Sequence, residues 1–70
     1  MYAFVKNLRK ADSVRRFSIR STDKGWEVRE EHDTAVVRHT HYSDWHRVER
    51  AERLMGIAVD GLRDQGWQEG

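Results

Sequence analysis

Apolar residues recur at intervals of three and four over the second half of the chain, from about residue 43 to residue 66. The recurring positions are Trp45, Val48, Ala51, Leu54, Met55, Ala58, Val59 and Leu62. This spacing puts them along one side of an α-helix, and charged residues occupy the other side. Gly56 and Gly61 each lower the helix propensity by about 1 kcal/mol relative to alanine, so packing must hold this helix. We therefore predict an amphipathic helix over residues 43–66 that lies on a sheet.

Both ends of this helix carry end signals. The hydroxyl of Ser43 is suited to accept a hydrogen bond from an unpaired amide of the first turn, and Asp44 adds negative charge at the positive end of the helix dipole. We expect Ser43 to be the N-cap. At the other end, Gly66 is expected in the left-handed conformation, with Trp67 contacting Leu62 in a Schellman ending.

Alternating apolar and polar residues predict three strands before the helix. Phe17 and Ile19 share one face of the first strand, and Trp26 and Val28 continue the pattern after a turn ending at Gly25. A second turn is expected around Asp33, which tolerates a left-handed conformation. The third strand, residues 35–42, has two possible registers, and we prefer the register with Val36 and Tyr42 inward over the one with Val37 inward.

The first twelve residues are ambiguous between a strand and a helix, because Tyr2 and Phe4 alternate whereas Phe4, Leu8 and Ala11 recur at helical spacing. We expect residues 1–12 to form a basic arm or an edge strand. The predicted fold is one small α+β domain over residues 1–70. Its three-stranded, or possibly four-stranded, antiparallel sheet spans residues 14–42 and packs on the long C-terminal helix of residues 43–66.

The 70-residue chain contains no cysteine, so neither a disulfide nor a zinc site built on thiolates can reinforce a small core. Lys6, Arg9 and Lys10 interrupt the apolar start before it reaches the length of a signal peptide. From these features we expect a cytoplasmic protein that does not bind a membrane.

Charge is unevenly distributed along the chain. Residues 1–21 contain six basic residues and one acidic residue, a balance of +5, and the other 49 residues balance at −4. A basic segment of this kind can contact the phosphates of nucleic acid. The candidate nucleic-acid-binding residues are Lys6, Arg9, Lys10, Arg16, Arg20 and Arg29. The alternative is a solvated sheet face, on which Glu27 and Glu31 pair with the arginines.

Four histidines, at positions 32, 39, 41 and 46, are the residues best able to bind a metal, but their spacing is not that of a zinc site. The serines are expected at strand, turn and cap positions, and a core of this size offers little room to bury a catalytic carboxylate pair. We expect no metal site, no cofactor, no catalytic residue and no enzymatic activity.

Two functions remain as hypotheses. The first is a small non-enzymatic interaction or accessory protein that binds an unknown protein partner or a second copy of itself, since Tyr2, Phe4 and Trp67 near the ends are large and apolar. The second is a nucleic-acid-binding module that uses the basic arm and sheet face. In both, the helix is expected to serve as scaffold.

Overall fold

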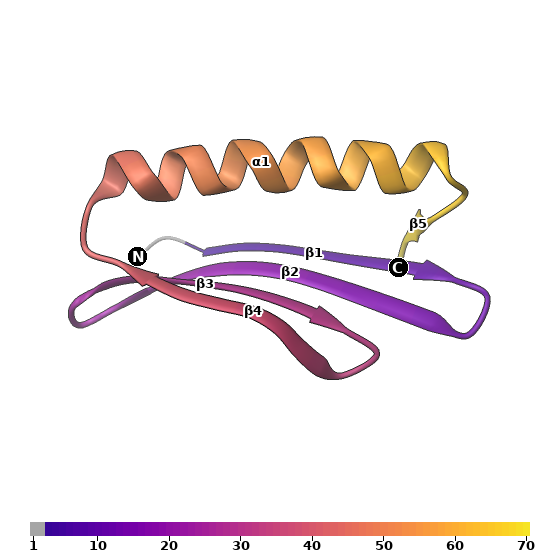
Figure 1. Ribbon diagram of the computed structural model, residues 1–70, viewed down its shortest axis with the longest axis horizontal. Helices are drawn as coiled ribbons and strands as arrows, with labels where there is room; N and C mark the ends of the chain where they lie inside the picture. Colours follow the sequence, from indigo (N-terminus) through magenta and orange to yellow (C-terminus); the bar gives the residue numbers. More distant parts are fainter. Residues whose placement is uncertain (1–2) are drawn as a thin grey trace.

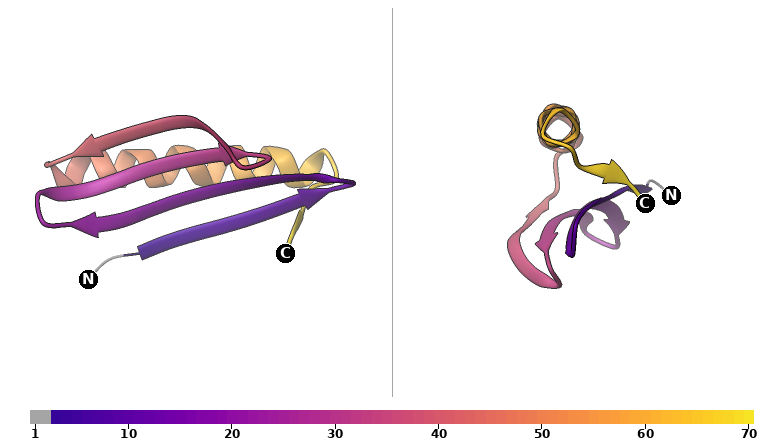
Figure 2. Two further views of the ribbon diagram at one scale, coloured as in Figure 1. Left: turned by 90° about the horizontal axis from the view of Figure 1, so that it is seen from below. Right: turned by 90° about the vertical axis from the view of Figure 1, so that its right-hand side faces the viewer.

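The computed structural model describes residues 3–70, which form five strands and one helix (Figure 1). The elements are β1 (Ala3–Lys10), β2 (Ser13–Thr22), β3 (Gly25–His32), β4 (Ala35–Tyr42), α1 (Trp45–Asp64) and β5 (Gln68–Glu69). All strand pairs are antiparallel, in the order β4-β3-β2-β1-β5. Helix α1 covers one face of this sheet, and the other face is open (Figure 2). The predicted α+β class is confirmed, but the sheet has five strands rather than three or four.

Two strands are added to the three predicted ones: β1 comes from the predicted basic arm, and β5 comes from the segment after the helix. Residues Ala3–Lys10 form a full strand that pairs with β2 along its whole length. It is not the edge of the sheet over its second half, because the two-residue strand β5 pairs with Leu8 and Arg9. A strand of two residues has no periodicity for a sequence pattern to detect. Tyr2 lies outside the described residues.

Both predicted hairpin turns adopt the backbone conformations expected of them. Gly25 has φ of +139°, and a Cβ atom added there would lie 2.2 Å from the carbonyl oxygen of Tyr42. Asp33 has φ of 51°. The Asp33 carboxylate also accepts a hydrogen bond of 2.8 Å from the amide of Val14, which ties the β3–β4 turn to the start of β2.

The preferred register of β4 is wrong at its first half. Tyr42 lies opposite Trp26 and packs against the core as predicted, but Val36 lies opposite Glu31 on the open face and is 46% exposed. The pairing of β3 with β4 shifts between Glu30 and Glu31, where an irregularity interrupts the ladder. Because side chains alternate with a period of two, this shift reverses the face on which the earlier residues of β4 lie.

Helix α1 begins one residue later than expected. Asp44, not Ser43, is the N-cap: its backbone is extended and its carboxylate accepts a 3.0 Å hydrogen bond from the amide of His46. The predicted C-terminal ending is confirmed. Gly66 has φ of +100°, and the amide of Trp67 donates to the carbonyl of Leu62 at 3.0 Å, as in a Schellman motif.

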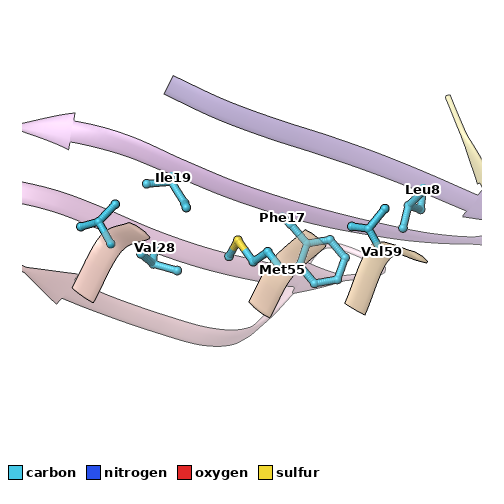
Figure 3. Close-up of a cluster of buried hydrophobic side chains, with 7 residues drawn as sticks. Leu8, Phe17, Ile19, Val28, Met55 and Val59 are labelled. Atoms are coloured by element: carbon cyan, nitrogen blue, oxygen red, sulfur yellow. The ribbon is translucent and has the colours of Figure 1, made fainter. Parts of the chain in front are cut away.

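The core lies between α1 and the central strands (Figure 3). Its buried residues are Leu8, Phe17, Ile19, Val28, Val48, Met55 and Val59. Phe4, Trp26 and Trp67 pack around this cluster, and the ring of Trp26 lies 5.4 Å from that of Trp45. Leu54, which the helical pattern placed in the apolar stripe, is 56% exposed at the side of the helix. Within the described residues, no helix is long and apolar enough to cross a membrane.

Candidate functional site

The predicted nucleic-acid-binding residues are divided between the two faces of the sheet. Lys6 lies opposite the buried Phe17. Lys6, Leu8 and Lys10 occupy alternate positions of β1, so all three are on the face covered by α1. The Lys6 ammonium forms a 2.9 Å ion pair with Glu69, and Lys10 donates to the carbonyl of Gln65 at 2.6 Å. These two lysines therefore hold the C-terminal segment against β1.

Glu69 is the centre of this attachment, since Arg63 pairs with it as well. The hydrogen bond from Lys6 is the largest cause that lowers the pKa of the Glu69 carboxyl, and the charge of Arg63 acts in the same direction. Lys6 is therefore paired with a carboxylate of its own chain, which makes it a poor candidate for phosphate contact.

The open face is mixed in charge. Arg16 and Arg20 lie 4.0 Å and 3.4 Å from the carboxylates of Glu31 and Glu27. A hydrogen bond from His39 is the largest cause that lowers the pKa of Glu27, and the charge of Arg20 lowers it further. Cross-strand pairs of this kind are an ordinary way to keep an exposed sheet face soluble.

Two predicted residues of the open face have no carboxylate partner. The Nε atom of Arg29 is buried without a hydrogen bond, and Arg9 forms no ion pair with any residue from 3 to 70. The face thus carries four arginines, at positions 9, 16, 20 and 29, and two glutamates, at positions 27 and 31. It has a modest excess of positive charge.

The histidines do not converge. His39 bonds Glu27, the Nε2 atom of His41 lies 3.2 Å from the Thr22 hydroxyl, and the His32 ring meets Trp67 edge-on at 6.3 Å. In residues 3–70, no group of three or more His, Cys, Asp or Glu side chains is arranged to hold a metal ion.

A groove of about 390 Å³ lies between α1 and the helix-covered side of β3 and β4. Its floor is apolar and includes Val28 and Met55. Three arginines line it, Arg38 from β4 and Arg47 and Arg50 from α1. We call this feature the arginine groove.

The guanidinium groups of the arginine groove are unpaired. Among residues 3–70, the guanidinium groups of Arg38, Arg47 and Arg50 form no hydrogen bond or ion pair with another side chain or with the backbone. Among the residues that the structure describes, Glu30 is the one carboxylate that lines the groove, and it lies opposite Arg38 in the β3–β4 ladder without an ion pair. The groove therefore has an excess of positive charge that no described residue neutralises.

The first turn of α1 contributes one of these arginines. It contains no acidic residue, and Arg47 lies in it. The carboxylate of Asp44 accepts from the amide of His46, and the carbonyl of Asp44 accepts from the amides of Arg47 and Val48. The positive charge at this end of the groove therefore comes from the side chains of Arg47 and Arg50 and not from free helix amides.

Strand β4 forms one rim of the groove and is an edge of the sheet, with β3 as its single neighbour. It is eight residues long, contains neither lysine nor proline, and exposes Val36 and Val37. Proteins protect edge strands from pairing with another chain by lysine, proline, short length, β-bulges and inward-pointing charges. Strand β4 has none of the first three, but it has an irregularity near Val37 and an inward charge at Arg38, so its regular free edge is residues 38–42.

Sequence reasoning did not select Arg38, Arg47 or Arg50, because they come from a strand and a helix that meet only in the folded chain. The available signal was the charge pattern of the helix: Arg47, Arg50 and Arg53 follow each other at a spacing of three, at which like charges repel. Arg53 has Glu49 four residues before it, but Arg50 has no acidic residue three or four positions away on either side that could pair with it.

Comparison of the chain with family models, with curated proteins and with solved structures gave no match. The class of the protein is therefore defined by its fold and its surface: a small α+β protein with an antiparallel sheet covered on one side by a helix, and with a free edge strand beside a cationic groove.

Proposed function

We propose that the protein is a non-enzymatic interaction protein that binds an anionic protein partner in the arginine groove. The observation that carries this proposal is the presence of three unpaired guanidinium groups around an apolar floor. Guanidinium groups recognise carboxylates with paired hydrogen bonds. A guanidinium group has several N–H donors in a fixed planar arrangement and no acceptor, so it suits binding of an anion.

Exposed apolar atoms support a protein partner over a small anion. Leu54 lines the groove and is 56% exposed, and Ala58 follows one turn later on the same side of α1. A polypeptide can bury these side chains while its carboxylates meet the arginines, which gives the apolar centre and charged surroundings usual in protein interfaces.

Binding of nucleic acid through the open face is the second candidate. The observation in its favour is the excess of arginine over glutamate on that face, with Arg9 and Arg29 free of carboxylate partners. It is the weaker candidate because Arg16 and Arg20 are paired with glutamates, and Lys6 and Lys10 point to the other face.

Fluorescence anisotropy with two labelled probes tests both candidates. The first probe is a ten-residue peptide in which glutamate alternates with valine, and the second is a single-stranded DNA of similar charge. We expect the peptide to bind the natural protein, and Arg50→Glu to weaken its binding about tenfold or more, because a charge-assisted contact becomes a repulsion.

Arg53→Glu is the matched control, since it changes the charge of the same helix by the same amount but Arg53 does not line the groove. We expect it to change peptide affinity by less than about twofold, because exposed charges outside a contact are largely screened. Equal losses for the two variants, or absence of peptide binding at low salt, would contradict the proposal. Salt-sensitive DNA binding that Arg9→Glu weakens and Arg50→Glu does not would favour the second candidate.

A further inference from the structure

We infer that the partner of the arginine groove is an acidic polypeptide segment that binds as an additional strand along β4. This inference rests on the proposed function and specifies the conformation and charge of the partner. In this mode the main chain of the partner bonds the free edge of β4, and alternate side chains of the partner enter the groove.

The two sides of the sheet differ in how much of their backbone is already paired. On the side opposite β4, strand β1 is partly paired with β5, and the amide of Gly70 donates a hydrogen bond to the carbonyl of Asn7. By contrast β4 has no strand on its outer side, and its residues 35–42 make no backbone hydrogen bond outside the sheet ladder within the described residues. Half of the amides and carbonyls of an edge strand point outward and are open to a partner strand.

The side chains of β4 that line the groove are regularly spaced along the strand. Arg38, Thr40 and Tyr42 occupy alternate positions of β4, so all three lie on the side of α1, spaced by about 7 Å. The helix runs back over the sheet in the opposite direction to β4 (Figure 1). Arg47 and Arg50 therefore lie towards the Tyr42 end of the groove, and Arg38 lies towards the other end.

A strand added to β4 would direct every second side chain into this space, at the same spacing of about 7 Å. Carboxylates at alternate positions of the partner would then meet arginines at both ends of the groove. The side chains between them would lie on the open face, next to His39 and His41. The expected partner motif is consequently a run of acidic residues at every second position.

A second copy of this chain is a poor occupant of the same edge. Symmetric pairing of β4 with β4 would bring together Arg38, Arg47 and Arg50 from both copies, with Glu30 as the carboxylate of each groove. Like charges brought together in this way oppose association. Strand β4 itself contains no acidic residue that would meet the arginines of a partner copy.

Two backbone-methylated forms of the glutamate–valine peptide test the inference. One form is N-methylated at every glutamate and the other at every valine, so the charge and the side chains are unchanged. In a strand, the amides of alternate residues point to opposite edges. We expect one form to bind at least about tenfold more weakly than the parent peptide, because its β4-facing amides cannot donate, and the other to bind within about threefold.

Each result has a distinct meaning. Equal affinities of the parent and both methylated peptides would overturn strand addition, while binding that still depends on Arg50 would leave the proposed function intact. Failure of the parent peptide to bind would overturn both. Sedimentation of the natural protein as a dimer, with peptide affinity falling as protein concentration rises, would show that a second copy occupies β4 and would also overturn the inference.

Discussion

Gly25 is the residue at which local backbone geometry most restricts substitution. Its φ of +139° is outside the range that other residues adopt without strain, and a Cβ atom would overlap the carbonyl oxygen of Tyr42 just before α1. We expect Gly25→Ala to lower the free energy of unfolding by about 2–4 kcal/mol, measured by urea denaturation.

Gly56 provides the matched substitution, because it lies within α1 and a Cβ atom there would meet no other atom within 4 Å. Gly56→Ala should raise the free energy of unfolding by about 0.5–1 kcal/mol through helix propensity. A Gly25→Ala variant as stable as the natural protein would show that the β2–β3 turn and the end of β4 are not as close as described.

At the scale of elements, the N-cap of α1 is Asp44 and not the predicted Ser43. The Asp44 carboxylate accepts from the amide of His46, whereas the Ser43 hydroxyl makes no hydrogen bond within residues 3–70. Asp44→Ala should therefore lower the free energy of unfolding by about 1 kcal/mol, and Ser43→Ala by less than about 0.5 kcal/mol. A larger loss for Ser43→Ala in thermal or urea unfolding would restore Ser43 as the cap.

How far the sequence predicts these elements depends on how local their causes are. The helix ending at Gly66 and the turn at Gly25 follow from residues within a few positions, and both are confirmed. The face of Val36 depends on an irregularity in pairing with β3, and β5 depends on contacts with β1, so neither has a local signature. The arginine groove is the extreme case, because Arg38 approaches Arg47 and Arg50 only after β4 and α1 have packed on the same sheet.

At the scale of the whole molecule, several basic side chains are paired within the chain, whereas Arg9, Arg29 and the arginines of the groove have no carboxylate partner among residues 3–70. Lys6 and Lys10 attach the C-terminal segment, and Arg16 and Arg20 pair across the open face. The arginine groove has no such pairing and lies beside the free edge of the sheet. The helix, which sequence reasoning treated as scaffold alone, thus also contributes one wall of the proposed binding surface.

The most direct test of the central claim is a two-dimensional ¹H–¹⁵N NMR titration of the natural protein with the glutamate–valine peptide. If the partner surface is the arginine groove, the largest chemical-shift changes will occur at the amides of Thr40, Tyr42 and Leu54, which line it. The account would be contradicted if the largest changes occurred instead at Asn7 and Ser18, on the open face of the sheet.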